Sequence, residues 1–198
     1  MIRKIIRIFT QLIPQTIKYA PHCVLFAMSG ARDVIAEDIE SFKRHRNIKV
    51  RSEMRALIIL LTDTPYYRTL FYRRLGRVGR LVRWYAKEPP TFTIDCEIGG
   101  GCYLAHPFAT ILAAKKIGKN FSCRQCTTLG NKQDGDNDSK PTIGDNVTLG
   151  ANVCIIGGIH IGDNVTVGAG SVVVKDCPAG CTVVGNPARI IKKTTCDG

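Results

Sequence analysis

Tryptophan occurs once and methionine three times in the 198 residues, and acidic side chains are scarce in the first half. Residues 1–90 contain 7 acidic and 18 basic side chains, whereas residues 91–198 contain 9 and 10. The net charge of +12 therefore belongs almost entirely to the first half, which predicts two regions of different construction. Nineteen glycines and a single tryptophan argue against a helical bundle throughout the chain.

Long apolar runs are also missing. No stretch approaches the roughly 18 apolar residues that a membrane-spanning helix needs, and the first residues lack the apolar core and cleavage site of a secretory signal. The nine cysteines are an odd, scattered set, and Cys123–Cys126 has no second CxxC pair at metal-binding spacing. We therefore expect a cytoplasmic protein without a disulfide framework or a bound metal.

A six-residue period is the strongest pattern in the sequence. From position 143 onward an aliphatic residue returns at every sixth position, at Ile143, Leu149, Ile155, Ile161, Val167 and Val173. The phase continues upstream through Ile98, Leu104, Ile111, Ile117, Cys123 and Leu129. Two intervals are irregular: seven residues separate Leu104 from Ile111, and fourteen separate Leu129 from Ile143.

This period fits neither a helix nor an antiparallel meander. It fits a chain that makes a short strand and a corner every six residues, so that three sides form a triangular coil of about 18 residues. The pattern resembles the hexapeptide-repeat acyltransferases over residues 92–190. That resemblance implies a mainly β fold, a left-handed parallel β-helix, with the aliphatic residues and Cys123 pointing inward.

Three further segments complete the predicted organisation. Residues 1–90 have helical spacing and form a basic α-helical region, which ends at Glu88-Pro89-Pro90. Residues 91–190 form the β-helix, and residues 191–198 a C-terminal tail. Within the β-helix, residues 131–141 contain no aliphatic side chain and must loop outward. In the family such a loop covers a neighbouring subunit's active site; a solvated insertion without a role is the alternative.

His106 is the predicted catalytic residue. It lies in IGGGCYLAHPF, which resembles the serine acetyltransferase segment where the general base follows an Ile-Gly-x-Gly motif. A neutral imidazole is the side chain suited to accept a proton from a hydroxyl near neutral pH. The resemblance assigns this role to His106, whereas His22, His45 and His160 lack such a context.

The C-terminal repeats resemble those of acetyltransferases that use acetyl-CoA. The resemblance implies a pantetheine groove along small residues and phosphate contacts from two cations; the alternative for the cations is a solvated lysine and an arginine that caps the last coil. The cofactor-binding residues predicted in this way are Gly150, Ala151, Gly168, Ala169, Lys175 and Arg189.

The acceptor side departs from the serine acetyltransferase pattern. Ala105 stands where the family has an acidic residue, and Ser139-Lys140-Pro141 replaces Arg-His-Pro. The entry to the coil is Thr91-Phe92-Thr93-Ile94 instead of Asp-Ile-His-Pro. We predict that Ala105 and Lys140 contact the acceptor, and that the acceptor is a sugar hydroxyl in cell-surface polysaccharide synthesis, small or lipid-linked. The alternative is serine O-acetylation for cysteine biosynthesis.

Other classes are less well supported by the residues. A metal-dependent hydratase on this fold needs several converging histidines, and the predicted coil contains only His106 and His160. The basic helical half has no nucleic-acid motif, and peripheral contact with the inner face of a membrane is the better use of its charge. For assembly, the resemblance implies a homotrimer, or two trimers joined through their helical regions, with acetyl-CoA bound between neighbouring chains.

Overall fold

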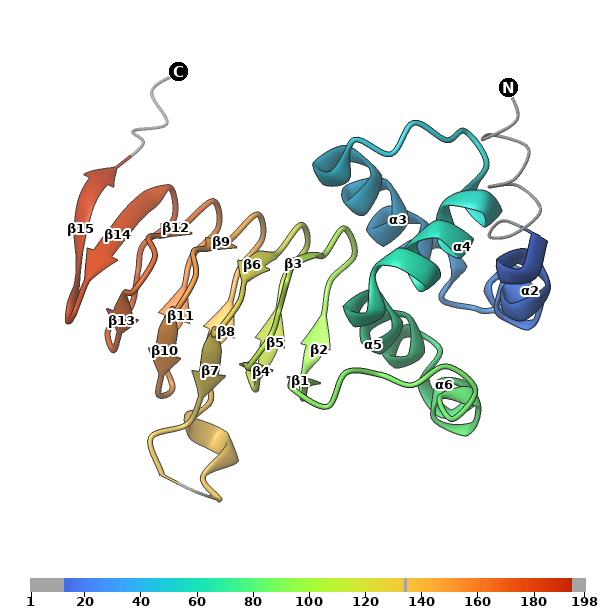
Figure 1. Cartoon of the computed structure of the whole chain (residues 1–198). Helices are drawn as coiled ribbons and strands as arrows, with labels where there is room; N and C mark the ends of the chain where they lie inside the picture. Colours follow the sequence, from blue (N-terminus) through green and yellow to red (C-terminus); the bar gives the residue numbers. More distant parts are fainter. Residues whose placement is uncertain (1–12, 134, 194–198) are drawn as a thin grey trace. The chain divides into compact units, whose positions relative to one another are not determined.

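The computed structural model describes residues 13–133 and 135–193 (Figure 1). The chain divides between Glu88 and Pro89 into two compact units, the first helical and the second a stack of short parallel strands. The helices of the first unit are α2 (Ile13–Met28), α3 (Arg32–Arg46), α4 (Glu53–Asp63), α5 (Pro65–Arg74) and α6 (Gly76–Val82).

Local signals in the sequence set the ends of these helices. The Ser52 hydroxyl accepts a hydrogen bond from the backbone N–H of Arg55 at the start of α4, and Pro65 occupies the first turn of α5. Asn47 ends α3 in the left-handed conformation. The helical region expected before the β-helix is therefore confirmed over α2 to α6.

The core of the helical unit is aromatic and aliphatic, and one buried ion pair crosses it. Arg74 on α5 pairs with Asp38 on α3 through an Nε–Oδ2 distance of 2.8 Å, and both side chains are almost fully buried. Removing either partner would leave a buried charge, which is strongly destabilising. The largest fully buried side chains of this unit are Tyr19, Phe26, Ile35, Ile39, Phe42, Leu57, Leu60, Leu61, Tyr67, Leu70 and Phe71.

The second unit is a parallel β-solenoid with three sheets, which confirms the fold class expected from the repeat. Sheet A contains β1 (Phe92–Ile94), β4 (Thr110–Leu112), β7 (Thr128–Gly130), β10 (Cys154–Ile156) and β13 (Val172–Val173). Sheet B contains β2 (Glu97–Ile98), β5 (Lys116–Ile117), β8 (Thr142–Ile143) and β11 (His160–Ile161). Sheet C contains β3 (Tyr103–Ala105), β6 (Ser122–Arg124), β9 (Thr148–Leu149), β12 (Thr166–Val167), β14 (Cys181–Gly185) and β15 (Ala188–Lys193).

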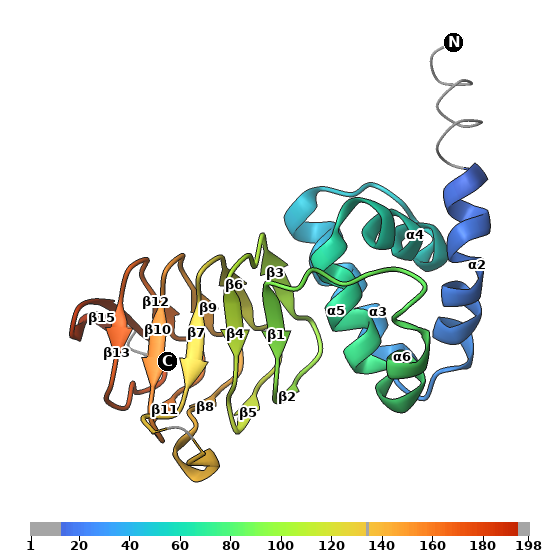
Figure 2. The same cartoon turned by 60° about the horizontal axis from the view of Figure 1, so that its bottom comes forward.

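The chain visits sheets A, B and C in turn, so three edges, AB, BC and CA, separate the sheets. Figure 2 shows the strands of sheet A side by side along the unit. In the later coils the register is 18 residues, as in the pairing of Ile143 with Ile161 and of Leu149 with Val167. The predicted inward aliphatics from 143 to 173 are at most 2% exposed, which confirms the phase of this region.

One inward residue is predicted wrongly. Ile111 is 49% exposed, and its neighbour Leu112 is fully buried and pairs with Leu129. From Leu104 to Leu112 the chain takes eight residues instead of six, so this corner carries two extra residues. Spacing alone could not show whether the corner carries one or two extra residues, because Ile111 and Leu112 are both aliphatic and either could point inward.

Edge BC shows how the corners turn. Asn120, Asn146 and Asn164 are all left-handed, with φ between 53° and 57°, a conformation that asparagine tolerates. Their amides form a ladder between coils: Asn120 Nδ2 donates to Asn146 Oδ1 (2.9 Å), and Asn146 Nδ2 donates to Asn164 Oδ1 (3.2 Å). Left-handed asparagines therefore mark the corners of edge BC.

Two segments depart from the regular coil. Residues 131–141 leave it at edge AB, between β7 and β8, and contain a short 3₁₀ helix at Asn137–Ser139. At the C-terminal end β15 runs antiparallel to β14 and reaches Lys193, three residues into the segment expected to be a tail.

Candidate active site

His106 lies on the enlarged corner of edge CA, directly after β3. Its backbone is left-handed (φ 53°), and so is that of Ala109 at the end of the same corner (φ 48°). For residues other than glycine this conformation costs roughly 1–2 kcal/mol. Such strain is found where a structure must aim a side chain. The corner leaves the His106 side chain exposed, as a general base requires.

The other corners of edge CA stack beneath this one. The backbone N–H of Cys126 donates to the carbonyl oxygen of Phe108 (2.8 Å), and Gly170 donates in the same way to Ala151 (2.8 Å). One left-handed residue recurs at each level, with φ of 58° at Cys126, 57° at Asn152 and 71° at Gly170. Only the first corner has a second left-handed residue, and that residue is His106.

The predicted groove residues follow His106 along the same edge. Gly150 and Ala151 lie two coils farther on, and Gly168 and Ala169 lie three. With a rise of about 4.8 Å per coil, this places them roughly 10 and 14 Å from the level of His106. The structure therefore brings one histidine and two small-residue pairs onto one straight edge.

Packing already requires the two glycines. A Cβ at Gly150 would lie 2.5 Å from the backbone nitrogen of Ala169, and one at Gly168 would lie 2.6 Å from Cγ1 of Val184. The absence of a side chain thus permits close stacking of successive coils. The side chains available to a ligand at this edge are the half-buried Ala151 and the exposed Ala169.

Lys175 and Arg189 meet at the C-terminal end of the solenoid. They line an open pocket of about 390 Å³, although 14 residues separate them in sequence. Both side chains are exposed. The pocket's other lining residues are Val173, Val174, Asp176, Cys177, Val183, Pro187, Ala188 and Ile190. The pocket therefore has a mostly apolar lining, with the cations of Lys175 and Arg189 and the carboxylate of Asp176 beside it.

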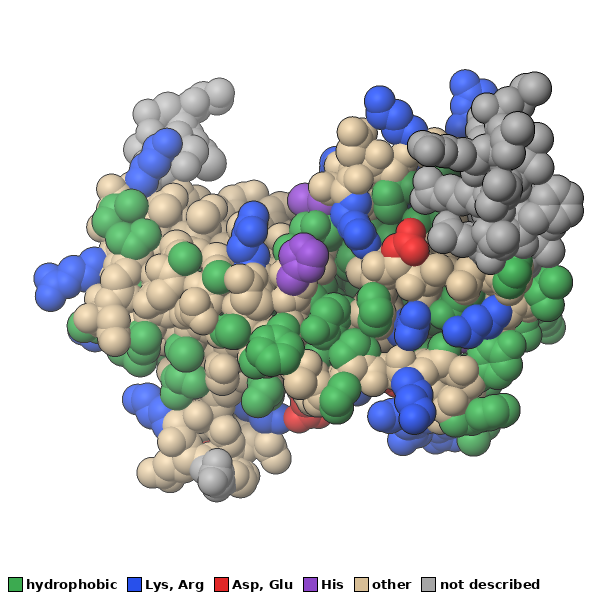
Figure 3. Space-filling model, in the orientation of Figure 1, with side chains coloured by type: hydrophobic (Ala, Val, Ile, Leu, Met, Phe, Trp, Pro, Cys, Tyr) green, Lys and Arg blue, Asp and Glu red, His purple; other side chains and the backbone are tan. Residues whose placement is uncertain are grey.

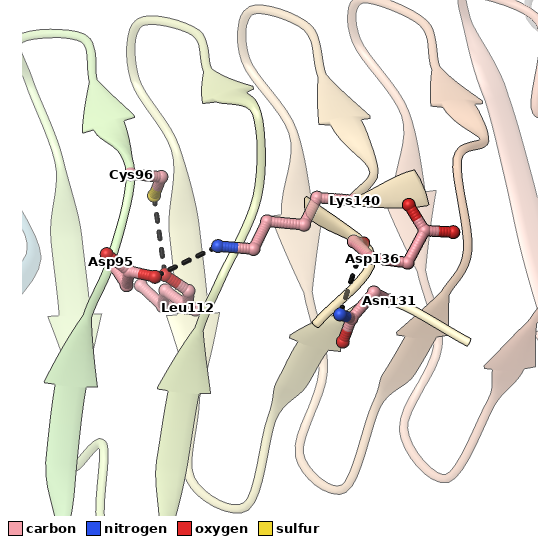
Figure 4. A network of polar contacts seen from close by, with 6 residues as sticks. All are labelled: Asp95, Cys96, Leu112, Asn131, Asp136 and Lys140. Carbon is pink, nitrogen blue, oxygen red and sulfur yellow. Dashed lines mark hydrogen bonds and ion pairs between the residues drawn. The ribbon is translucent and has the colours of Figure 1, made fainter. Parts of the chain in front are cut away.

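Lys140 lies on a different edge from His106 and Ala105. Its Nζ is 3.0 Å from Oδ2 of Asp95, so loop 131–141 is tied to the first corner of edge AB (Figure 4). The Lys140 side chain is 16% exposed and that of Asp95 66%. Within the loop, Asn131 Nδ2 donates to the carbonyl oxygen of Asp136 (3.1 Å).

Asp95 was missed by the sequence analysis. It stands 45 positions from Lys140, and no local motif links the two residues. Ala105 is half-buried in β3 of sheet C, beside His106 but on the far side of sheet A from Lys140. The two predicted acceptor residues are therefore not brought together within one chain.

The remaining histidines are placed elsewhere. His160 begins β11 in sheet B, and its backbone N–H donates to Asp176 Oδ1 (2.8 Å). His45 donates a hydrogen bond from Nδ1 to the carbonyl oxygen of Ser41 (2.8 Å). Among the described residues, no three His, Cys, Asp or Glu side chains gather as a metal site would require.

His22 is the buried histidine of the helical unit. It is 1% exposed, and its Nε2 is hydrogen-bonded to the Tyr72 hydroxyl (2.6 Å). Burial, followed by the positive charges of Arg68 and Lys18, lowers the pKa of His22 to about 4. In the described part of the chain, its Nδ1 has no hydrogen-bond partner. His22 is therefore neutral at pH 7 and has a structural place.

Comparison with known proteins agrees with the repeat and the fold. Residues 142–175 match the family model described as the hexapeptide repeat of succinyl-transferase. Serine acetyltransferase 1, chloroplastic, of Arabidopsis thaliana is 44% identical over 128 residues, which cover 62% of this chain and 40% of that protein. The chain spans about half or less of the length of the curated relatives it matches.

Solved structures show the same architecture. The crystal structure of Neisseria gonorrhoeae serine acetyltransferase is 26% identical with a TM-score of 0.67, covering 84% of this chain and 68% of that one. A serine acetyltransferase in complex with CoA is 25% identical with a TM-score of 0.63, covering 81% and 70%. The repeat and the solenoid define a hexapeptide-repeat protein. Within that class, the chain is similar to the serine acetyltransferases.

Proposed function

We propose that the chain is an acetyl-CoA-dependent O-acetyltransferase with L-serine as its acceptor and His106 as general base. The observation that carries the proposal is the position of His106 on an inserted, left-handed corner at the head of edge CA. The choice of L-serine as the acceptor rests on the similarity to serine acetyltransferases, and the structure of one of them in complex with CoA supports the cofactor.

The proposed reaction is a direct acetyl transfer. A ring nitrogen of His106 accepts the proton of the serine hydroxyl while the hydroxyl oxygen attacks the carbonyl carbon of the thioester. The tetrahedral intermediate collapses with cleavage of the C–S bond, and the thiolate of CoA takes up the proton. Backbone N–H groups at the corner are suited to hold the developing oxyanion. The thioester is already activated, so no acyl-enzyme is needed.

The proposed path of acetyl-CoA follows edge CA and ends in the pocket at the C-terminal end, which reaches from Arg189 on β15 to Lys175, beyond β13 at edge AB. Small side chains at Ala151 and Ala169 leave room for a thin pantetheine arm, and the pocket that holds Lys175 and Arg189 offers cations for the phosphates. The acetyl group would then reach the level of His106. The proposal thus assigns Ala151 and Ala169 to the pantetheine arm and Lys175 and Arg189 to the phosphates.

Asp95 and Lys140 support serine as the acceptor. Serine carries an ammonium and a carboxylate, and the family's residues for these groups are replaced in this sequence. The Asp95–Lys140 pair places one carboxylate and one ammonium 3.0 Å apart at edge AB, with the Asp95 side chain 66% exposed. Asp95 would bind the serine ammonium and Lys140 the carboxylate, each through a charge-assisted hydrogen bond.

The proposed site is shared between chains. His106 lies on edge CA and Lys140 on edge AB, and a side of five or so extended residues spans roughly 15 Å. One serine molecule cannot reach both within one chain. We place edge CA of one chain against edge AB of the next in a ring of three copies, which is a heterologous interface that closes. Phe108, on the first corner of edge CA, is 55% exposed, and Ile111, on β4 of sheet A, is 49% exposed. Both side chains are suited to burial against a neighbouring chain.

A sugar hydroxyl is the second candidate acceptor. It is favoured by Ala105, an uncharged residue beside His106 where the family has an acidic one. The compared proteins are serine acetyltransferases, so they do not support the sugar as the main acceptor.

Thiol release from acetyl-CoA tests the two acceptors directly. The purified chain is assayed with L-serine and, separately, with a panel of nucleotide-linked and lipid-linked sugars. We expect release that depends on L-serine and yields O-acetylserine. Turnover with sugars alone would overturn the serine proposal but keep the acetyltransferase, whereas no turnover with any hydroxyl acceptor would overturn both.

A further inference from the structure

Helix α6 and the turn after it expose a mixed basic and hydrophobic surface. Val78, Leu81 and Trp84 are 45%, 74% and 76% exposed. Exposed arginines separate them in sequence. We call this set the α6 surface: Arg77, Val78, Arg80, Leu81, Arg83 and Trp84. Single exposed hydrophobic residues are ordinary, but a cluster with a tryptophan indicates an interaction site.

Packing of α6 explains why this surface faces solvent. Gly79 is buried, and a Cβ added to it would collide with the backbone carbonyl of Tyr72 on α5. The helix therefore lies against α5 through its glycine. At 100° per residue, Arg77 and Leu81 project from the side opposite Gly79, and Trp84 is exposed in the turn that follows the helix. The close contact between Gly79 and the Tyr72 carbonyl therefore keeps the α6 surface directed toward solvent.

The charge of the segment has one sign. From residue 64 to residue 87 there are seven basic side chains and no acidic one. Arg83 pairs with Glu88 at 3.2 Å, whereas Arg77 and Arg80 have no ion pair within the described ranges. Figure 3 shows basic and hydrophobic side chains gathered over the region that α6 occupies in Figure 1.

We propose that the α6 surface binds the headgroup region of an anionic lipid bilayer. Arginines would contact lipid phosphates, while Trp84 and Leu81 would enter the boundary with the acyl chains, where tryptophan is enriched. A second copy is a poorer occupant, because symmetric pairing of this surface would oppose arginine to arginine. Within the described residues no helix is long and apolar enough to cross a bilayer. The inference does not depend on the acceptor.

The protein carries its own probe. Trp84 is the only tryptophan in the chain, so its fluorescence reports on the α6 surface alone. The full chain is titrated with vesicles of phosphatidylcholine containing phosphatidylglycerol, and with vesicles of phosphatidylcholine only, at low and high salt. We expect a blue shift and protection from acrylamide with the anionic vesicles at low salt, and neither with the neutral ones.

Two matched double variants separate a specific surface from overall charge. R77Q/R80Q removes two charges from the α6 surface, and R51Q/R55Q removes two exposed charges outside it. At about 1 kcal/mol per arginine near a membrane surface, R77Q/R80Q should weaken vesicle binding roughly thirtyfold. R51Q/R55Q should bind within about threefold of the unmodified chain. L81S, with Trp84 retained as the probe, should also weaken binding.

Each remaining outcome overturns the proposal. Equal losses in the two double variants would mean that net charge alone drives binding. A Trp84 emission that is already blue and protected without vesicles, and that shifts to the red on dilution, would mean that a second copy covers the surface. Absence of any shift with anionic vesicles at low salt would exclude the membrane contact. Circular dichroism and acetyltransferase turnover in solution show whether each variant is folded.

Discussion

The ammonium nitrogen of Lys140 lies 3.0 Å from Oδ2 of Asp95, although 45 positions separate the two residues. This contact fixes a polar loop to the first corner of edge AB. It also places two opposite charges on an edge that does not carry His106. A serine acceptor would need both sets of residues, and that need is the physical basis for a site shared between chains.

Replacing His106 tests the proposed base. H106A should lower kcat by roughly a hundred- to ten-thousandfold, because positioned base catalysis contributes that much. Binding of acetyl-CoA, measured by calorimetry, should change little, since His106 lies at the end of the proposed path. H160A removes an exposed histidine from sheet B and is the matched control. Substantial turnover in H106A would rule out the mechanism.

Removing charge at Asp95 or Lys140 tests recognition of the acceptor. D95N and K140Q should each raise KM for L-serine about tenfold or more with little change in kcat, because each loses one charge-assisted hydrogen bond worth about 1.5–3 kcal/mol. R32Q, which removes one partner of the exposed Arg32–Glu53 pair, should leave KM unchanged.

Truncated acceptors make this test selective. Aminoethanol has no carboxylate, so K140Q should not affect its turnover; 3-hydroxypropionate has no ammonium, so D95N should not affect its turnover. A uniform loss with all acceptors would instead indicate that the pair only holds loop 131–141 in place.

Mixed assemblies test the shared site. H106A chains are unfolded and refolded together with D95N/K140Q chains in equal amounts, and activity is measured at low serine. In a ring of three, about one quarter of the sites should combine an intact His106 with an intact Asp95–Lys140 pair from the neighbour. If every chain carried a complete site, mixing would restore nothing. Light scattering should give the mass of a trimer or of two trimers.

His22 should make the helical unit less stable in mild acid. Its pKa is about 4 in the folded chain against an ordinary 6.5, so the unfolded chain binds the extra proton first. The stability is complete above pH 6.5 and is lost as the pH falls toward 4, by roughly 2 kcal/mol at pH 5. Thermal unfolding followed by circular dichroism at pH 7.5 and 5 measures the loss. H22F/Y72F, which removes both hydrogen-bonding partners, should lose less over the same interval; an equal loss would contradict this account.

A side chain at position 79 should lower the stability of the helical unit. G79A forces α6 away from the Tyr72 carbonyl and should cost about 1–3 kcal/mol, as overpacking does. G30A is the matched control, because nothing lies within 4 Å of a Cβ at that glycine. A lowered Tm in G79A but not in G30A is the expected result. Equal Tm values would show that α6 is not held by this contact.

Much of the fold follows from sequence alone. The six-residue return of an aliphatic side chain from Ile143 to Val173 predicts the inward column, because a buried position in a stack of equal coils must recur at the coil's own period. The asparagines that precede a valine in the repeats suit left-handed corners, since few residues other than asparagine and glycine adopt that conformation without strain. His106 also stood out, through its resemblance to a family motif.

The tertiary structure decided what the period leaves open. Spacing could not show that Leu112, and not Ile111, points inward, because hydrogen bonds between coils fix the register where the corner gains two residues. Nor could it pair Asp95 with Lys140, since an outward loop has no period and its contacts depend on where the coil beneath it turns. The sequence by itself determined the repeating coil; the stacking of the coils determined which side chains share an edge.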